Sequence, residues 1–438
     1  MLFFKLCSAV IISLVCLTSC SKNLSYSYLG NGWGNNSVNT VKFRKNALTT
    51  SGNYQFTAFY DTDSYVVLGK RPLSSKKWAI LKTRYKGNTK DAHNDISIAI
   101  DGKGYAHVSW DHHDTALRYA KGKKPYGLEL GDEMIMTGKQ EDKVTYPEFY
   151  NLPNGNLLFF YRSGQSGRGN LIINSYDLKT ETWQQLQNSL IDGENQRSAY
   201  WQACVDAQGF IHISWVWRET WDVETNHDLC YARSKDGGKT WEKSTGEIYK
   251  LPITSASAEY AWSIPQKSNL INQTAMSADK YGNPYIATYW NVNQIPQYQV
   301  VYLSAGNWKK INTGFRKTPF VLGGGGTKKI PISRPDILID DSGKETAINI
   351  LFRDEERHNK VSLAYGFLKD NSIWNVTDLT KESVGEWEPN YDNFLWEKSK
   401  KLHVFIQNVA QIDGEGITEG NDSEVSILHI NKLEKYRK

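Results

Sequence analysis

GKGYAHVSWDHHDTALRYA, residues 102–120, is one copy of a pattern that recurs along the chain. A turn containing glycine leads into a run of alternating polar and apolar residues, and a polar loop separates this run from a second one. Residues 208–234, QGFIHISWVWRETWDVETNHDLCYARS, repeat the pattern. Alternation with a period of two is typical of a strand with one buried face, so each copy predicts a β-hairpin.

Further copies of this hairpin pattern occur on both sides of these two. They begin at Ser51, Asn154, Tyr281, Ser342 and, more weakly, Ser399. The spacing of roughly 50 to 70 residues lies in the range of propeller blades with loop insertions. A short strand such as 95–100 precedes each glycine turn, and a fourth strand follows, often marked by a tryptophan (Trp78, Trp183, Trp241, Trp308, Trp374). The sequence therefore predicts an all-β, seven-bladed β-propeller with four antiparallel strands per blade.

Two other all-β folds are less consistent with this repeat. A pair of β-sandwiches rarely repeats one supersecondary unit seven times, and a β-helix needs a much shorter period. The stretch Gly323-Gly324-Gly325-Gly326 is interpreted as a mobile loop between the fifth and sixth blades. Residues 31–438 are thus expected to form a single propeller domain.

The N-terminus has the features of a targeting signal. In MLFFKLCSAVIISLVCLTSC, residues 1–20, Lys5 is the only charged residue and an apolar run follows that is too short to span a bilayer. The segment 17–20, LTSC, resembles a bacterial lipobox, which implies a signal peptide over residues 1–19 and a lipid on Cys20. An ordinary secretory signal with a chance cysteine is the alternative. We expect residues 20–30 to be a lipidated tether, and the protein to reside in the bacterial cell envelope, at the outer membrane or cell surface.

Composition narrows the possible partners. The 438 residues include 52 basic and 47 acidic side chains, a net charge of +5, without a block of Lys and Arg that would indicate nucleic-acid binding. The balance is compatible with an acidic substrate, and 15 Trp, 25 Tyr and 15 Phe suit sheet faces and sugar platforms. We expect a monomer that contacts the membrane only through its lipid. Cys204 and Cys230, which remain in the folded body, are open to a disulfide, to two free thiols or to metal binding.

The propeller topology selects the candidate site residues. The innermost strand of a blade starts at the same face to which the second strand returns, so residues at these two positions share one rim. The residues placed at this rim are His93, Asn94, His112, His113, Tyr146, Arg162, Tyr200, Arg218, Arg334 and Tyr391. His107 and His212 lie in the middle of strands and are interpreted as structural.

The residue types at this rim favour one kind of sugar chemistry. Histidine and tyrosine can move protons, and arginine binds a carboxylate in a bidentate manner. A standard glycosidase needs a pair of carboxylates, which the second to fourth blades do not offer at the rim. The set fits β-elimination from a uronic acid, in which arginine neutralises the carboxylate while other side chains remove the C5 proton and protonate the leaving oxygen. This chemistry requires neither a metal nor a cofactor.

Several long phrases resemble one family. They are GWGNNSVNTVKFRK (32–45), DAHNDISIAIDGKGYAHVSWDHH (91–113), TYPEF (145–149), YRSGQSGRGN (161–170) and SWVWRET (214–220). They are similar to the BNR-repeat propellers that include the ulvan lyases of polysaccharide lyase families 24 and 25. The resemblance implies endolytic β-elimination of ulvan, an acidic sulfated polymer of rhamnose and uronic acid.

The resemblance also implies roles for individual residues. The catalytic histidine pair falls on His93 and His113, the acid/base tyrosine on Tyr146, the carboxylate-neutralising arginine on Arg162 and a second tyrosine on Tyr200. His112 takes the place of His113 if the strand register differs by one residue. Asn94, His112, Arg218, Arg334 and Tyr391 are expected to bind substrate.

The family further carries a structural metal, usually zinc. His227 and Cys230 offer an imidazole and a thiolate three residues apart, which is half of a zinc site. The remaining ligands are not identifiable from the sequence. A rim histidine and an unrelated buried thiol are the alternative interpretation.

Two other functions remain open. SKDGGKTW, residues 234–241, resembles the Asp-box turn of sialidase-like propellers. A sialidase-like glycoside hydrolase is therefore one alternative function. That enzyme would need an arginine triad, for which Arg162, Arg334 and Arg353 are candidates, together with a Tyr–Glu pair and an acid. A non-catalytic glycan-binding lipoprotein would use aromatic platforms and would not need His93, His113 and Tyr146 together.

Overall fold

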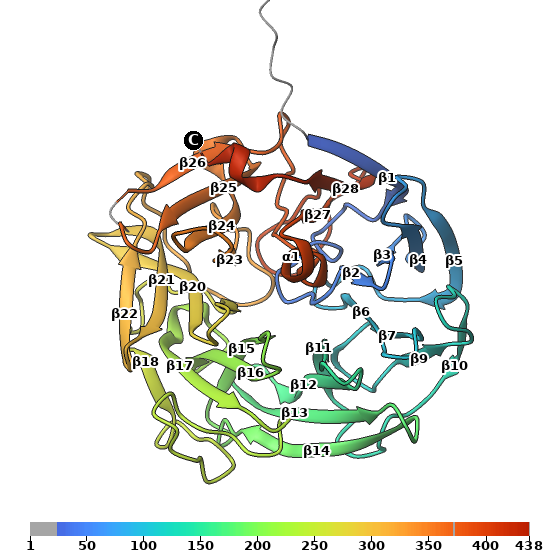
Figure 1. Cartoon of the computed structure of the whole chain (residues 1–438), viewed down its shortest axis with the longest axis horizontal. Helices are drawn as coiled ribbons and strands as arrows, with labels where there is room; N and C mark the ends of the chain where they lie inside the picture. Colours follow the sequence, from blue (N-terminus) through green and yellow to red (C-terminus); the bar gives the residue numbers. More distant parts are fainter. Residues whose placement is uncertain (1–23, 371–372, 438) are drawn as a thin grey trace, which may run out of the picture.

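The chain folds into a ring of β-sheets around a central axis (Figure 1). The computed structural model describes residues 24–370 and 373–437. The predicted signal peptide and the lipidation site Cys20 lie outside the described residues, so they stay predictions. Across the described residues, no helix has the length and apolar character needed to cross a membrane.

Four sheets contain four antiparallel strands each, as the repeats predicted. The first contains β2 (Leu48–Ser51), β3 (Tyr54–Tyr60), β4 (Tyr65–Pro72) and β5 (Ala79–Lys86). The second contains β6 (Ile96–Ile100), β7 (Ala106–Trp110), β9 (Tyr119–Gly122) and β10 (Leu130–Glu133). The third contains β19 (Ala275–Ala278), β20 (Pro284–Val292), β21 (Ile295–Ser304) and β22 (Asn307–Asn312). The fourth contains β23 (Asp336–Asp340), β24 (Ala347–Asp354), β25 (Lys360–Phe367) and β26 (Asn375–Asp378).

A nine-stranded sheet lies between the second and third of these. It contains β11 (Val144–Asn151), β12 (Leu157–Gln165), β13 (Arg168–Asp177) and β14 (Thr182–Ile191), then β15 (Ser198–Val205), β16 (Ile211–Arg218), β17 (Asn226–Ser234) and β18 (Glu259–Trp262). The eight strands β11 to β18 form two four-stranded meanders, which are joined by a single parallel pair between Gly169 and Ser198. The short β8 (His113–Thr115) pairs with β11 at the other edge, so the loop after β7 reaches across to the next sheet.

The ring is closed by a sheet that combines strands from both ends of the described chain. β1 (Leu24–Gly32) pairs with β28 (Ser423–Ile430), which pairs with β27 (Leu402–Ile406). The prediction that residues 20–30 are a tether is therefore wrong for residues 24–30. They form a strand because the alternating sequence LSYSYLG satisfies the free edge of β28.

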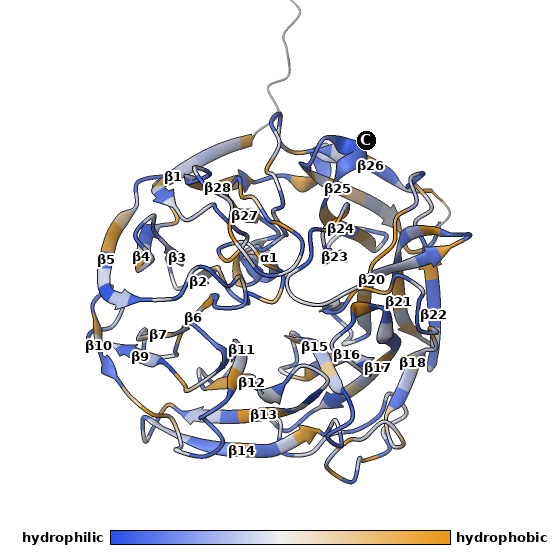
Figure 2. Cartoon of the chain, turned by 180° about the vertical axis from the view of Figure 1, so that it is seen from behind, coloured by the Kyte–Doolittle hydropathy of each residue, from blue (hydrophilic) through white to orange (hydrophobic). Residues whose placement is uncertain are grey.

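The helical elements are short. The α-helix α1 (Asn393–Ser399) lies near the centre of the ring in both views (Figures 1 and 2), and the Asp392 side chain caps it by accepting from the Leu395 amide. The 3-10 helices are η1 (Val223–Thr225), η2 (Glu355–Arg357) and η3 (Leu433–Tyr436).

The repeated hairpins and the Asp-box turn are as the sequence predicted. Each predicted hairpin is present, as β3–β4, β7–β9, β12–β13, β16–β17, β20–β21, β24–β25 and β27–β28. In the Asp-box, the Asp236 carboxylate accepts from the backbone amides of Lys239 and Thr240, and the Trp241 indole is fully buried. Cys204 and Cys230 are free thiols, so they do not form a disulfide.

Candidate active site

One pocket collects most of the predicted site residues. Its volume is about 250 Å³. Its lining includes the predicted residues His93, His113, Tyr146, Arg162, Tyr200, Arg218 and Arg334. They come from the segment before β6, from β8, from the first residues of β11 and β15, from the last residues of β12 and β16, and from the segment before β23. The starts of inner strands and the ends of second strands therefore do share one rim.

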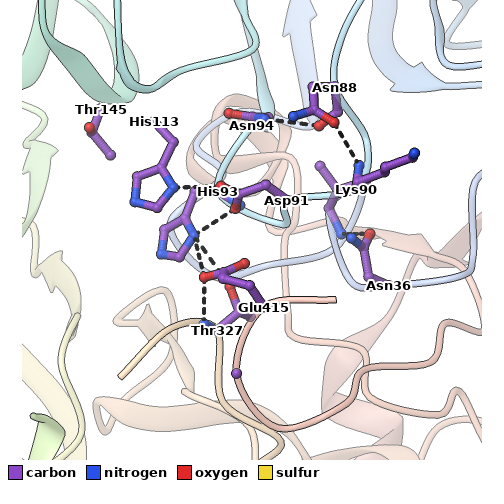
Figure 3. A network of polar contacts seen from close by, with 12 residues as sticks. Asn36, Asn88, Lys90, Asp91, His93, Asn94, His113, Thr145, Thr327 and Glu415 are labelled. Carbon is purple, nitrogen blue, oxygen red and sulfur yellow. Dashed lines mark hydrogen bonds and ion pairs between the residues drawn. The ribbon is translucent and has the colours of Figure 1, made fainter. Parts of the chain in front are cut away.

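A single carboxylate organises the two pocket histidines (Figure 3). His93 Nδ1 lies 2.9 Å from one oxygen of Asp91, and His113 Nδ1 lies 2.5 Å from the other. The two imidazole rings stack, with centroids 4.0 Å apart. Because each Nδ1–H donates to Asp91, both Nε2 atoms are left for a ligand. Asp91 was not among the predicted site residues, although it stands two residues before His93 in one of the quoted phrases.

The shared carboxylate gives the two histidines different charges. Burial alone would lower the pKa of His93, but hydrogen bonds to Asp91 and Glu415 raise it to about 9, so this ring is cationic at neutral pH. Burial and the neighbouring cationic His93 lower the pKa of His113, so this ring is neutral. Burial opposes ionisation of Asp91, but the hydrogen bonds from His113 and His93 prevail and hold its pKa below the usual range. The pocket thus contains one fixed cation and one neutral imidazole.

Tyr146 enters the pocket through an irregularity of its strand. The register between β11 and β12 shifts between Thr145 and Glu148, which marks a β-bulge at Tyr146-Pro147. Tyr146 has φ +58°, a left-handed conformation that is unfavourable for a tyrosine before a proline. The bulge turns the ring into the pocket, 5.1 Å from Phe43 and 6.0 Å from His93 between centroids. Burial raises the pKa of Tyr146, so its hydroxyl keeps its proton.

Arg162 lies over the ring of Tyr146. Its Cζ is 4.9 Å from the ring centroid, and the guanidinium donates to the Gly164 carbonyl and the Thr145 hydroxyl. Its Nη1 is buried without a hydrogen-bond partner, and the ion pairs of the described residues do not include Arg162. A buried cation with an unused donor is costly unless a ligand accepts from it. Arg162 is therefore suited to hold an anionic group.

Tyr200 lies beside Arg218 and is also under the electrostatic influence of Arg162. Its ring centroid is 6.0 Å from that of Tyr146 and 5.4 Å from Cζ of Arg218, and its hydroxyl is 2.9 Å from the Ser166 hydroxyl. Burial alone would raise the pKa of Tyr200, but Arg218 and Arg162 lower it to about 8. Tyr200 thus ionises more readily than an ordinary tyrosine.

Arg334 differs from the other two pocket arginines. Its Nη1 is 2.8 Å from Glu388, and its backbone amide donates to the other oxygen of the same carboxylate. The nearby Lys42 amide also donates to Glu388. Because its charge is already paired with Glu388, Arg334 mainly helps to hold the segments that contain Arg334, Glu388 and Lys42 together.

Two loops that are distant in sequence complete the pocket. Thr327 follows the Gly323–Gly326 stretch, and its hydroxyl is 3.4 Å from His93 Nδ1 (Figure 3). Glu415 lies in the connection between β27 and β28, 3.2 Å from the same nitrogen, and accepts from the Thr327 amide. No local sequence signal links these loops to His93, so only the fold reveals them. The glycine stretch itself lies against the pocket, where Gly325 and Gly326 line it.

Three predicted substrate-binding residues do not line the pocket. The Asn94 side chain donates to the Asn88 carbonyl and fixes the loop before β6. The fully buried His112 points into its own sheet, 3.0 Å from the Ser109 hydroxyl, and burial lowers its pKa to about 3. His112 lies in the loop between β7 and β8, and His113, the first residue of β8, lines the pocket instead. Tyr391 borders an inner cavity of the ring with Lys42 and Asp336.

The predicted metal ligands His227 and Cys230 do not form a metal centre with their neighbours. Both His227 nitrogens are engaged, at 2.9 Å from Glu219 and 2.9 Å from Asp228. The Cys230 thiol is fully buried, and burial raises its pKa, which disfavours the thiolate that binds zinc. Within the described ranges, the group of three clustered metal-ligating residues is Asp91, His93 and His113 instead. The donors at 227 and 230 therefore do not fit a tetrahedral zinc site, and whether the protein contains zinc stays a prediction.

Curated relatives share only part of their length with this chain. An ulvan lyase, long isoform, of Pseudoalteromonas sp. (strain PLSV) is 22% identical over 198 residues, covering 36% of this chain and 20% of the relative. An ulvan lyase, short isoform, of Alteromonas sp. (strain LOR) is 31% identical over 107 residues, covering 23% of this chain and 20% of the relative. These matches span about a fifth of the relatives' length.

Solved structures resemble the fold over nearly its whole extent. A polysaccharide lyase described as a PL25 ulvan lyase superposes with a TM-score of 0.67 at 16% identity, covering 93% of this chain and 96% of its own. The polysaccharide lyase Uly1 gives a TM-score of 0.63 at 16% identity, covering 93% and 92%. Residues 54–316, more than half of the chain, match the family described as BNR repeat-containing. The chain therefore belongs to the BNR repeat-containing family.

Proposed function

We propose that this protein is a polysaccharide lyase that cleaves an acidic, uronate-containing polymer, ulvan in the first instance, by β-elimination. The observation that carries the proposal is the pocket itself, which combines an unpaired arginine, a cationic and a neutral histidine, and two tyrosines with different pKa values. The ulvan lyases among the similar proteins support this choice of substrate. One of those lyase structures is bound to -[GlcA(1-4)Rha3S]-.

The proposed reaction assigns one task to each group. Arg162 and cationic His93 hold the uronate carboxylate and stabilise the negative charge that develops when C5 loses its proton. Neutral His113, oriented through Nδ1 by Asp91, takes that proton on Nε2. The electron pair forms the C4–C5 double bond as the C4–O bond breaks, and Tyr146 gives its proton to the leaving oxygen. Tyr200 is the alternative base, because its lowered pKa makes a phenolate accessible.

The same observations argue against the two other functions. A glycosidase needs two carboxylates that are free to act on the glycosidic bond, but Asp91 is committed to two histidines and Glu415 to His93 and Thr327. Of the proposed arginine triad, Arg334 and Arg353 are paired with Glu388 and Glu386. A simple glycan-binding protein would not need a tyrosine held at positive φ between an arginine and two histidines.

Three further features belong to this proposal. We count the ring as seven blades, with the nine-stranded sheet as two blades and the sheet of β1, β27 and β28 as the closing blade. The protein acts as a monomer, anchored through Cys20 to the bacterial cell envelope. Catalysis uses side chains alone, and a structural zinc, where present, would stabilise the fold without taking part in the reaction.

The deciding experiment is digestion of ulvan with two readouts in parallel. A lyase releases products that carry an unsaturated uronate, which absorbs ultraviolet light, and each cleavage adds one such group. We expect absorbance and reducing ends to rise together. Reducing ends without absorbance would identify a hydrolase, and binding without either signal would identify a glycan-binding protein.

A further inference from the structure

Trp221 is the one exposed tryptophan among the 15 in the chain, all of which lie in the described residues. Its side chain is 64% exposed, whereas Trp215 and Trp217 on the neighbouring strand are fully buried. It also lines the pocket of His93, Tyr146 and Arg162. An exposed aromatic ring at the edge of a polar pocket offers an apolar face on which a sugar ring can stack.

The Trp221 indole is held in place before any ligand binds. Arg218 donates to the Trp221 carbonyl. Gly325 packs against the ring, since a Cβ at this glycine would lie 2.7 Å from Cε3 of the indole. The glycine stretch is in turn fixed by the Val223 amide, which donates to the Gly324 carbonyl at 3.0 Å, and by the Gly324 amide, which donates to Asp222 at 2.9 Å. A platform held in this way loses little conformational entropy on binding.

Arg218, whose guanidinium donates to the Trp221 carbonyl, is a second unpaired cation. Arg218 is buried, its Nε has no hydrogen-bond partner, and the ion pairs of the described residues do not include it. Arg162, the other unpaired pocket arginine, is assigned to the uronate carboxylate. The two guanidinium groups lie over different rings, Arg162 over Tyr146 and Arg218 over Tyr200. Arg218 therefore offers a positive charge for a second anionic group of the ligand.

We propose that Trp221 and Arg218 form a second sugar subsite next to the site of cleavage. The indole stacks on the face of the sugar adjoining the uronate, and Arg218 donates to an anionic substituent, such as a sulfate ester, on that sugar. This inference rests on the proposed function and adds a requirement to it. The substrate must extend beyond the reacting uronate, and the neighbouring sugar must be charged.

The platform is tested with Trp221→Ala, Trp221→Phe and the matched control Tyr281→Ala. Tyr281 is 75% exposed and lies in the turn before β20, away from the pocket lining. On ulvan we expect Trp221→Ala to raise KM about tenfold while kcat changes little, as loss of one aromatic contact would. Trp221→Phe should recover most of the affinity, and Tyr281→Ala should match the wild type. An unchanged KM for Trp221→Ala overturns the platform.

The charge requirement is tested with Arg218→Gln on native and chemically desulfated ulvan. We expect the variant to weaken binding of native ulvan by about tenfold or more, and to bind the desulfated polymer nearly as the wild type does. Equal losses on both polymers overturn the anionic subsite.

Binding is also followed by tryptophan fluorescence in the Tyr146→Phe background, where the polymer should stay intact. This readout separates the subsite from the chemistry. A fluorescence change that disappears in Trp221→Phe supports the subsite even if no unsaturated product ever forms. A protein that binds no acidic polymer overturns both proposals.

Discussion

Histidine–carboxylate contacts in the middle of two sheets differ from those of the pocket at the rim. His107 on β7 lies 2.7 Å from the Tyr119 hydroxyl through Nδ1 and 3.2 Å from Asp101 through Nε2. His212 on β16 repeats the arrangement with Tyr231 and Asp206, at 2.7 and 2.9 Å. All four nitrogens are used, and both rings are fully buried. In the pocket, by contrast, His93 and His113 use only Nδ1.

The residue types are the same in both settings, so the difference lies in position along the strand and in the neighbours that this position supplies. In mid-strand, both neighbours of the ring come from its own sheet, and burial lowers the pKa of His107. At the rim, the loop beside the strand supplies Asp91, loops from other sheets supply Thr327 and Glu415, and one ring nitrogen stays open to the pocket. The mid-strand clusters stabilise the blades, and the rim cluster is available for chemistry.

Removing one tyrosine hydroxyl in each setting should give the largest contrast. Tyr146→Phe keeps the ring but removes the proton for the leaving oxygen, so we expect turnover to fall by roughly 10²- to 10⁴-fold with an unchanged melting temperature. Tyr119→Phe removes the partner of His107, so we expect normal turnover and lower thermal stability. Unsaturated-uronate release and thermal unfolding measure the two effects.

These two variants, together with His113→Ala, can also refute the assignment. If Tyr146→Phe turns over normally while His113→Ala is inactive, histidine alone carries the proton and Tyr146 is only part of the pocket wall. If Tyr119→Phe is inactive but stable, the mid-strand cluster is catalytic and the comparison fails.

Loss of the guanidinium geometry of Arg162 should have the next largest effect on activity. Arg162→Lys keeps the positive charge but loses the planar pair of donors, and we expect kcat/KM to fall by about 10²-fold. Arg334→Lys is the control, because Arg334 is already paired with Glu388 and should affect stability more than turnover. Equal losses of kcat/KM in both variants would show that overall positive charge, rather than the fork of Arg162, is what matters.

The repeated hairpins and the rim positions could be predicted from the sequence because both follow from local patterns. Alternation and glycine turns define the hairpins, and propeller topology then places His93, Tyr146 and Arg162 on one rim. His112 was misplaced because a one-residue difference in register decides which of two adjacent histidines faces the pocket. The bulge at Tyr146 could not be predicted either, although Pro147, which follows it, cannot donate a hydrogen bond to a neighbouring strand.

The parts of the site contributed by loops could not be predicted. Thr327 and Glu415 lie 234 and more residues from His93 in sequence, and only closure of the ring brings them to its Nδ1. The surroundings of His227 and Cys230 differ from the expected half of a zinc site for another reason. Spacing alone pairs His227 with Cys230, but the strand buries the thiol while Glu219 and Asp228 occupy the imidazole.

Removal of the carboxylate that joins the two pocket histidines should have a smaller effect on the reaction rate and a clear effect on its pH dependence. Asp91→Asn removes one of the two carboxylates, the other being Glu415, that raise the pKa of His93 to about 9, and it removes the anion that orients His113. We expect activity to fall by about 10- to 100-fold, as for other residues that orient a reacting group. In the pH profile of kcat/KM, the alkaline limb, where His93 loses its proton, should move to lower pH.

The wild-type profile separates the two candidate bases. With His113 as the base, its lowered pKa places the acidic limb of kcat/KM below pH 6.5. With Tyr200 as the base, the acidic limb lies near pH 8, and Tyr200→Phe removes it. An acidic limb near pH 8 that survives in Tyr200→Phe contradicts both assignments.

The mid-strand cluster should give the smallest effect on activity and a measurable one on stability. His107→Leu leaves the buried Asp101 carboxylate without its imidazole partner, so we expect the free energy of unfolding to fall by about 1–3 kcal/mol while turnover is unchanged. Burial lowers the folded-state pKa of His107 below the unfolded value near 6.5, so the unfolded chain binds the extra proton first. The wild type should therefore lose stability as pH falls below about 6.5, and the variant should lose less over the same range. Denaturant unfolding at pH 7.5 and 5.5 measures both quantities. A variant that keeps wild-type stability but loses turnover would place His107 in the chemistry and erase the distinction between the two settings.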